Sequence, residues 1–521
     1  MAVLPAFVVV MLIAALLVSA ALPTRFASAP FIRSGAWLRL ATTALLGASL
    51  AAGPWLGLQS RPLLQAPIGD ASIDLLYWNG LAWLMLALVS FIGWIVARFS
   101  RRQLDGDPGG ATYYRHVALT LGGILLAVVA GNLLLMLAGW LAANFGLRRL
   151  LAYYQEHPGA QEGARMKYAV DQLGAALLVG AVVLISQTYG TLNLAALAQV
   201  DASAAADAAA AGLVAWLLVF AAAVISVQFP FHFWLPEALA TPTPVSALMH
   251  AGIVNAGGYF LIRLSGLLVA APSALTMLAA AGAATLLLGG FAMLAQSSVK
   301  KTLAFSTVAQ MGLMMLQCGL GAWTAAMLHI VAHSLYKAYA FLASGDVLVT
   351  AQAVKPLHGE ASAQQLPAAV RLAVAVAIVA TCYLAVATAT GLSPLAKPGG
   401  FLLGAVLCIA LVRRTWVLLQ DNLLRMAAVS AVTTLGLCLV YSFAYLAIDA
   451  VVAGSTIARA PAPVQTVLSL GVGAALAALL AWELAVDRRP SGRVATAFYV
   501  HALNGFYVDA AARRVLRSVS T

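Results

Sequence analysis

The stretch 227–246, VQFPFHFWLPEALATPTPVS, interrupts a chain that otherwise consists of long apolar runs. Pro230, Pro236, Pro242 and Pro244 lie within it, and each lacks the backbone N–H that an intact helix needs. Of the 521 residues, 63% are hydrophobic and only 9% are charged. Non-helical backbone at membrane depth is tolerated only inside protein or beside a watery cavity. The four prolines therefore predict either a broken helix within a membrane or a proline-rich loop between two spans.

The apolar runs on both sides of this stretch predict the fold class. A helix needs about 20 apolar residues to cross the bilayer, whereas the strands of a β-barrel alternate apolar and polar residues. No such alternation is visible, so we predict an all-α polytopic membrane protein with about fifteen transmembrane helices. The predicted spans are 4–22, 38–59, 76–97, 116–136, 138–154, 168–189, 211–229, 244–262, 273–295, 302–320, 323–343, 370–390, 399–419, 426–447 and 464–485.

Basic residues are distributed unevenly and account for the net charge of +12. Nearly all of the 29 Lys and Arg lie in or nearest to connections that follow odd-numbered spans. By the positive-inside rule, this asymmetry predicts an N-terminus outside and a C-terminus in the cytoplasm of a bacterial inner membrane. The membrane setting explains the basic balance, and we predict lipid contact and no nucleic-acid partner.

His329, His333 and Lys337 share one face of one predicted span because their spacing is i, i+4, i+8. Ionisable groups inside a membrane are costly and usually face a bundle interior or a cavity. Histidine exchanges protons near neutral pH, so the three side chains predict a proton relay. The alternative is structural, with each histidine bonded to a backbone carbonyl and Lys337 extended to the membrane edge. His250 and Gln310, in two earlier spans, are further polar candidates.

Two histidines four residues apart also bind zinc when a third ligand joins them. No Asp or Glu lies between or beside His329 and His333, so the pattern favours the relay, and we predict no metal site. The sequence has no phosphate-binding glycine motif and no haem or iron–sulfur spacing. We therefore predict a transporter or energy-coupling protein without a cofactor of its own, rather than an enzyme.

Two long motifs resemble a known family. Residues 227–264, which begin VQFPFHFWLPEALATPTPVSALMHAG, and residues 298–345, which include AAMLHIVAHSLYKAYAFLASG, resemble the proton-translocating antiporter-like subunits of respiratory complex I and of Mrp-type antiporters. The resemblance implies two inverted five-helix repeats, each with a broken helix. The implied domains are 1–110 for the first spans, 111–265 and 266–420 for the repeats, 421–486 for the last spans and 487–521 for a basic cytoplasmic tail.

The resemblance also implies roles for individual residues. The family's proton-path positions are matched by His250, Lys300, His329, His333 and Lys337, and its lysine at the second helix break is matched by Lys397. The first repeat departs from the pattern, because Leu141 replaces the expected glutamate and Ile225 the expected lysine. Asp171 is the nearest remaining acid, and with Gln310 it completes the candidates. The second repeat is therefore predicted to be chemically better equipped.

Within this family, the sequence is most similar to the membrane subunit of the DAB inorganic-carbon accumulation system, on LMHAGIVNAGG, AHSLYKAYAFLASG and the tail HALNGFYVDA. This similarity implies a hetero-oligomer with a large peripheral subunit that resembles carbonic anhydrase and carries the zinc. Ion flow through the membrane subunit would drive conversion of carbon dioxide to bicarbonate by that partner. The alternatives are a proton-pumping subunit of a redox complex or hydrogenase, and a stand-alone antiporter.

Overall fold

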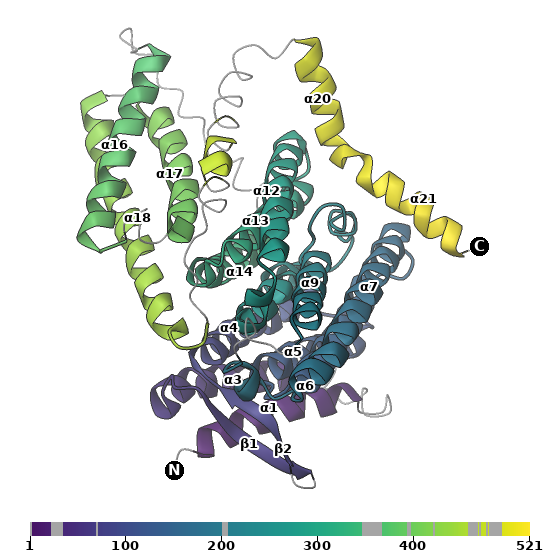
Figure 1. Cartoon of the computed structure of the whole chain (residues 1–521). Helices are drawn as coiled ribbons and strands as arrows, with labels where there is room; N and C mark the ends of the chain where they lie inside the picture. Colours follow the sequence, from purple (N-terminus) through teal and green to yellow (C-terminus); the bar gives the residue numbers. More distant parts are fainter. Residues whose placement is uncertain are drawn as a thin grey trace.

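Long helices packed side by side make up most of the protein (Figure 1). The computed structural model describes residues 3–21, 35–68, 71–200, 207–345, 367–392, 398–419, 423–456, 467, 470–475, 478 and 492–520. The elements up to the proline-rich stretch are α1 Val3–Ala21, α3 Ala36–Leu56, β1 Arg61–Ile68, β2 Ala71–Trp78, α4 Gly80–Gln103, α5 Gly110–Val129, α6 Leu133–Leu151, α7 Pro158–Tyr189, α8 Leu194–Leu197 and α9 Ala208–Ile225. The elements after it are α10 Thr243–Ala251, η3 Ile253–Asn255, α11 Ala256–Arg263, η4 Ser265–Ala270, α12 Pro272–Ala295, α13 Val299–Gly319, α14 Trp323–Leu342, η5 Ala343–Gly345, α16 Ala368–Ala389, α17 Pro398–Leu418, α18 Leu423–Val452, α20 Arg493–Leu503, η6 Gly505–Tyr507 and α21 Val508–Ser520.

Nine helices among the described residues are long and apolar enough to cross a membrane. They include α4 to α7, α9, the combined segment Thr243–Arg263 and α12. The predicted span 116–136 is wrong at its end, because α5 stops at Val129 and the Asn132 side chain accepts from the backbone N–H of Leu135 to start α6. The total of fifteen spans stays a prediction, and the span 464–485 lies largely outside the described residues.

The all-α prediction is wrong in one place, because β1 and β2 form an antiparallel hairpin. The hairpin is anchored from a distance: Asn193 accepts the backbone N–H of Asp74 at 3.0 Å and donates to the carbonyl of Ser72 at 2.9 Å. Trp78 donates its indole N–H to the carbonyl of Gly57 at 2.8 Å. These contacts join segments far apart in the sequence, which is why the local pattern of residues 61–78 did not indicate them.

The proline-rich stretch is irregular backbone between two helices. α9 ends at Ile225, and turns continue until α10 begins at Thr243. Pro230 and Pro236 lie within these turns, while Pro242 and Pro244 flank the first residue of α10. We call residues 226–242 the break segment. α7 packs closely on it, since a Cβ added at Gly163 would lie 2.9 Å from the carbonyl oxygen of Glu237.

Glycines set the closest helix crossings in both halves of the chain. In the α5–α6 pair, a Cβ added at Gly139 would lie 2.6 Å from the backbone nitrogen of Ala127. In the α12–α13 pair, a Cβ added at Gly312 would lie 2.4 Å from the backbone nitrogen of Leu286. Small residues let helix backbones approach in a membrane, where van der Waals packing drives association. The same device therefore joins the first two helices of each predicted repeat.

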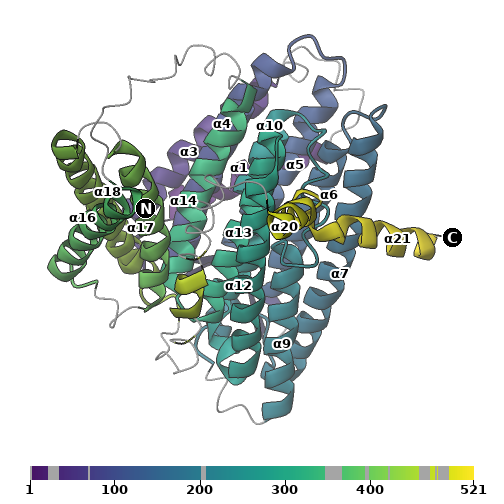
Figure 2. The same cartoon turned by 90° about the horizontal axis from the view of Figure 1, so that it is seen from above.

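The C-terminal segment lies across the bundle. Figure 2, from above, shows α20 passing over the region of α12 and α13, with α21 continuing beyond α7. The α20 ring of Phe498 meets Phe291 of α12 at 4.8 Å between centroids, and Gln296 donates to the carbonyl of Leu503 at 3.1 Å. α16, α17 and α18 form a separate group at one side in both views. The tail thus covers the ends of α12 and α13 near the break segment.

Candidate functional site

The predicted ladder on α14 is buried between α13 and α10. His329 is 5% exposed, His333 is 3% exposed and Lys337 is fully buried. The rings of the two histidines lie 5.9 Å apart between centroids. The helical spacing therefore directs all three side chains into protein, where a charge is expensive unless it is held by polar partners. Their role as a relay stays a prediction.

Glutamines of α13 hold the two histidines of α14. His329 Nδ1 lies 3.1 Å from Gln317 Oε1, and His333 Nδ1 lies 2.6 Å from Gln310 Oε1. His333 Nε2 also lies 3.2 Å from the carbonyl oxygen of His250. Both partners of His333 are thus oxygens, which suits an imidazolium that donates from both nitrogens. A neutral His333 ring keeps its bond to the His250 carbonyl. Its Nδ1 then accepts a hydrogen bond if the Gln310 amide turns over, so that its NH₂ group faces the ring. Gln310 thus accommodates both protonation states of His333.

A second interruption of the backbone brings His250 into this cluster. α10 stops at Ala251, and η3 separates it from α11. The carbonyl of His250 is thereby available to His333, and the carbonyl of Ala251 accepts from Ser334 at 2.6 Å and from Asn255 at 3.0 Å. A short 3₁₀ turn within a helical segment often marks a functional hinge. The sequence signal for it was the Gly252 that follows the helix.

The His250 ring is fully buried and carries no hydrogen bond among the described residues. It stacks on Phe341 of α14, with 4.2 Å between ring centroids and 15° between the planes. Buried polar groups are normally paired, so two unpaired ring nitrogens call for an explanation such as a transient proton or water. The two unpaired ring nitrogens keep His250 among the candidates for proton exchange, and this role stays a prediction.

Lys337 disagrees with the part of the structural alternative that concerns it, although His333 does contact a backbone carbonyl, as that alternative expects. Its amine donates to the Ser306 hydroxyl at 2.8 Å and to the Leu303 carbonyl at 2.9 Å. The side chain is fully buried and does not extend to the membrane edge. Uncharged partners of this kind satisfy the hydrogen-bond donors of the amine without a carboxylate to fix its charge. The amine can therefore hold or release a proton without leaving an unpaired negative carboxylate beside it.

The other predicted residues are placed separately. Lys300 lies half-buried in the first turn of α13, and no hydrogen bond or ion pair among the described residues joins it to the ladder. Lys397 lies outside the described residues. Asp171 is 9% exposed on α7 and pairs with a residue that the sequence reasoning assigned to a loop.

That missed residue is Lys167, which is 4% exposed within α7. Its amine forms an ion pair with Asp171 one turn later and donates to the Asn144 side chain at 2.8 Å. It also lies 4.9 Å from the ring centroid of Trp234 in the break segment. The i, i+4 spacing of Lys167 and Asp171 was visible in the sequence, but α7 begins ten residues before the predicted span. The predicted first repeat therefore contains a buried charge pair, one that the family pattern did not indicate.

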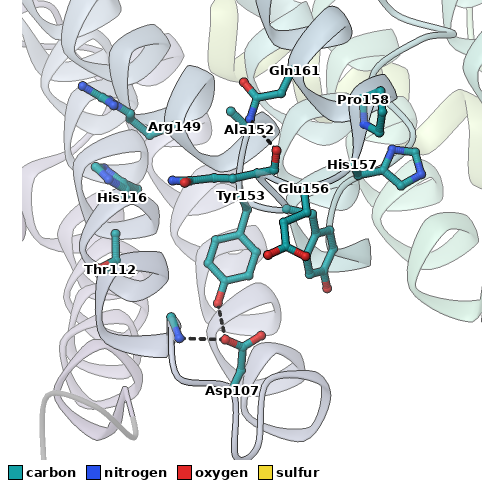
Figure 3. A pocket seen from close by; sticks show the side chains of 13 residues that line it. Asp107, Thr112, His116, Arg149, Ala152, Tyr153, Glu156, His157, Pro158 and Gln161 are labelled. Carbon is teal, nitrogen blue, oxygen red and sulfur yellow. Dashed lines mark hydrogen bonds between the residues drawn. The ribbon is translucent and has the colours of Figure 1, made fainter.

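A large hollow lies away from these residues. It measures ≈ 1010 Å³ and is lined from the start of α5, the end of α6 and the start of α7 (Figure 3). The Tyr153 hydroxyl donates to Asp107 at 2.7 Å, and Asp107 also accepts the backbone N–H of Gly109. Burial, followed by this hydrogen bond, raises the pKa of Tyr153 above that of free tyrosine. None of the residues that line this hollow belongs to the ladder. The buried polar cluster on α14 therefore remains the better candidate for the functional site.

Known proteins resemble this chain in sequence. The family model described as NADH:quinone oxidoreductase/Mrp antiporter, transmembrane, matches residues 130–420. Probable inorganic carbon transporter subunit DabB2 of Halothiobacillus neapolitanus is 38% identical over 443 residues, which cover 83% of this chain and 78% of that protein. NADH-quinone oxidoreductase subunit L of Escherichia coli is 35% identical over 285 residues, which cover 54% of this chain and 46% of that protein.

A solved structure resembles the chain in fold. The Mrp complex from a Dietzia species contains a chain that matches with a TM-score of 0.65 and 24% identity. The match covers 98% of this chain and 59% of that one. At this identity the likeness concerns the helical arrangement alone.

Proposed function

The chain belongs to the NADH:quinone oxidoreductase/Mrp antiporter transmembrane family, and on this premise we propose that it conducts protons to drive inorganic-carbon accumulation. The family consists of antiporter-like, proton-conducting membrane subunits, which agrees with the nine helices that can cross a membrane in the described residues. The proposed substrate of the whole assembly is carbon dioxide or bicarbonate. It is supported by the relative named as a probable inorganic carbon transporter subunit.

The observation that carries the proposal is the buried lysine at the end of a histidine ladder. Lys337 is fully buried, and within the described part of the chain its amine donates hydrogen bonds to a hydroxyl and a carbonyl. His333 and His329 continue from it at one-turn intervals, and His250 faces the same cluster. Protons on His333 and Lys337 repel each other in a medium of low dielectric, so the arrival of one favours release of the other. We propose that these four groups carry protons inward, with Gln310 bonded to His333 and Lys300 as a further relay.

The coupling step requires an element with two arrangements. The interruption between α10 and α11 is a natural choice, because His250 and Ala251 present carbonyls to α14 there. A proton that binds one arrangement better than the other shifts the population between them. We propose that this shift reaches a large peripheral zinc-containing subunit, which performs the chemistry on inorganic carbon.

The two inverted repeats, 111–265 and 266–420, are part of the proposal. The glycine crossings of α5 with α6 and of α12 with α13 support the division. The third helix of each repeat, α7 or α14, also carries a buried lysine held by a polar side chain of the helix before it. The proposed orientation puts the N-terminus outside and the tail in the cytoplasm of the inner membrane.

Uptake of labelled inorganic carbon tests the proposal directly. Cells that depend on this chain should lose uptake when an uncoupler collapses the gradient, and Lys337→Met should reduce uptake to that of cells without the chain. Arg102→Met, which removes an exposed charge at the end of α4, serves as the control and should keep uptake. Full uptake by the Lys337→Met variant would exclude the ladder as the proton carrier.

Affinity purification identifies the partner class. A co-purifying large zinc protein agrees with inorganic-carbon coupling. Iron–sulfur or quinone-reactive subunits would instead support the redox-complex function, for which subunit L of Escherichia coli is the relevant relative. Recovery of the chain with no partner at all would favour the stand-alone antiporter.

A further inference from the structure

Arg263, the last residue of α11, is a buried arginine without a carboxylate partner. It is 8% exposed, and no ion pair joins it to an acid in the described part of the chain. A guanidinium stays protonated in proteins, whereas the amine of a buried lysine such as Lys337 can lose its charge. A charge that is removed from water is costly unless an opposite charge lies beside it. Arg263 therefore calls for a counter-ion that the described residues do not supply.

The sequence places this charge on the less basic side of the predicted membrane. Arg263 directly follows the predicted span 244–262, which is even-numbered, and few of the 29 Lys and Arg lie beside such connections. The positive-inside rule therefore does not account for it. On the proposed orientation Arg263 lies at the outer end of its span, so its presence there needs a local reason.

The side chain of Arg263 joins three neighbouring segments. Nη1 donates to Asn79 Oδ1 at 2.9 Å, and Nη2 donates to the carbonyl of Ala130 at 3.4 Å. The guanidinium also lies 4.9 Å from the ring centroid of Tyr77. Asn79 precedes α4, Ala130 follows α5 and Tyr77 belongs to β2. These contacts hold the guanidinium in place, but all three partners are neutral and leave its charge uncompensated.

The guanidinium also has donors to spare. An arginine side chain carries five N–H groups, and the hydrogen bonds to Asn79 and Ala130 use two of them. Nε is buried and has no hydrogen bond partner within the described ranges. A buried donor without an acceptor is costly, and such groups are rare in folded proteins. An anion beside the guanidinium would supply both an acceptor and the missing negative charge.

A small cavity adjoins Arg263 and measures ≈ 80 Å³. Its lining also includes Ser455 and Thr456, which come from the segment that follows α18. Neither hydroxyl forms a hydrogen bond with the described residues, so both are available as donors. No Asp or Glu is among the described residues that line the cavity. The lining thus combines a fixed positive charge with two hydroxyl groups, which suits a negatively charged ligand.

The size of the cavity limits the ligand to a small ion. A water molecule takes about 30 Å³ of liquid volume, so ≈ 80 Å³ leaves room for a small inorganic anion and little more. Hydrogen bonds from a guanidinium to an anion are charge-assisted and stronger than bonds between neutral groups. A single negative charge balances the single positive charge of Arg263. Chloride and bicarbonate both meet these conditions, whereas a bulky organic acid does not.

We propose that this cavity binds one small monovalent anion, bicarbonate or chloride, with Arg263 as its counter-charge and Ser455 and Thr456 as further donors. The inference goes beyond the proposed proton path, because it concerns other residues and can be tested whether or not Lys337 carries protons. The bound anion connects the segment after α18 to Arg263, which in turn contacts β2 and the start of α4. Binding should therefore stabilise the folded chain at this junction.

Thermal unfolding of the purified full chain in detergent tests the site. An anion that binds only the folded protein raises the unfolding temperature as its concentration increases. Sodium bicarbonate and sodium chloride are each compared with sodium gluconate, whose anion is too bulky for the cavity, at equal ionic strength and mildly alkaline pH. At least one of the two small anions should raise the unfolding temperature of wild type, and Arg263→Gln should remove this rise.

Arg98→Gln is the matched control for the loss of an arginine. Arg98 also packs on an aromatic ring, at 4.3 Å from the centroid of Trp94, but it is exposed and lies on another helix, α4. This variant should keep the full response to the anion. The site assignment fails if neither small anion stabilises wild type more than gluconate does. It fails equally if Arg263→Gln responds as strongly as wild type.

Equilibrium dialysis identifies the anion and leaves the arginine in place. Wild type is dialysed against labelled bicarbonate or labelled chloride, each with an excess of the other anion as competitor. Bicarbonate that chloride does not displace identifies inorganic carbon as the ligand, the reverse result identifies chloride, and mutual displacement means that the site accepts both. Each of these results upholds the proposal, and the binding of neither anion overturns it.

A double variant, Ser455→Ala with Thr456→Val, keeps the falsifying power of the experiment even where Arg263→Gln does not fold. It removes both hydroxyls from the cavity wall and retains the guanidinium with its contacts to Asn79 and Ala130. We expect the dissociation constant of the anion to rise severalfold. An unchanged dissociation constant would show that the anion binds elsewhere and would refute the assignment of this cavity.

Discussion

Asp171→Asn should destabilise the protein more than any replacement of an exposed acid. The substitution removes the carboxylate that neutralises Lys167 and leaves an amine of 4% exposure with Asn144 and the face of Trp234 as its partners. Breaking one side of a buried ion pair typically costs about 3–5 kcal/mol, because the remaining charge stays away from water. Both members of this pair are more than nine-tenths buried, so we expect the loss in free energy of unfolding to fall within this range.

The double variant Lys167→Met with Asp171→Leu separates charge from shape. Replacing a buried ion pair by apolar residues of similar volume is often neutral or stabilising, by about 1–4 kcal/mol. We therefore expect the double variant to unfold close to wild type or later, and the single variant to unfold clearly earlier. Denaturation of the purified full chain in detergent, followed by intrinsic tryptophan fluorescence, measures this order. Glu156→Gln, at an exposed acid between α6 and α7, should stay within about 0.5 kcal/mol of wild type.

Two results would refute the reasoning. A single variant as stable as the Glu156→Gln control would mean that Lys167 finds water or sheds its proton at no cost. A double variant less stable than Asp171→Asn would mean that shape rather than charge dominates the contact. Uptake by a folded double variant also tests the predicted place of Asp171 in the proton path, since we expect the second repeat to sustain transport without it.

Three further outcomes follow from the packing and the connections between spans. Gly139→Leu should prevent α5 and α6 from closing, because its Cβ would meet backbone atoms at 2.6 Å, and the variant should fail to accumulate in membranes, as a blot against wild type will show. Asn193→Ala removes two hydrogen bonds to the hairpin, each worth about 0.5–1.5 kcal/mol, and should speed amide hydrogen exchange in β2 without loss of the helices. Tyr153 should ionise well above the usual value of about 10, because burial and then Asp107 raise its pKa; the difference spectrum against Tyr153→Phe on alkaline titration measures this. Replacing Asp107 by Ala should move that ionisation back down.

Local patterns in the sequence were enough for the membrane character and the ladder. Apolar runs of span length decide whether a chain is soluble, and the i, i+4, i+8 spacing puts His329, His333 and Lys337 on one face of any helix that contains them. Irregular backbone around the four prolines was predictable for the same reason, because missing backbone donors act on the residues beside them, whereas the choice between a broken helix and a loop stays open. These properties depend on residues that are close along the chain, so the sequence shows them directly.

Tertiary structure alone decided what those residues meet. The burial of Lys337 depends on Ser306 and Leu303 of another helix, and the hairpin depends on Asn193, more than a hundred residues from the strands it holds. Lys167 was misplaced because a helix end had to be located before its partner Asp171 acquired meaning. Contacts of this kind depend on how whole helices pack, and no periodic pattern of residues along the sequence predicts them. The sequence by itself thus predicted a membrane protein with three polar residues on one face of a helix. The fold decided that this face is buried among other helices.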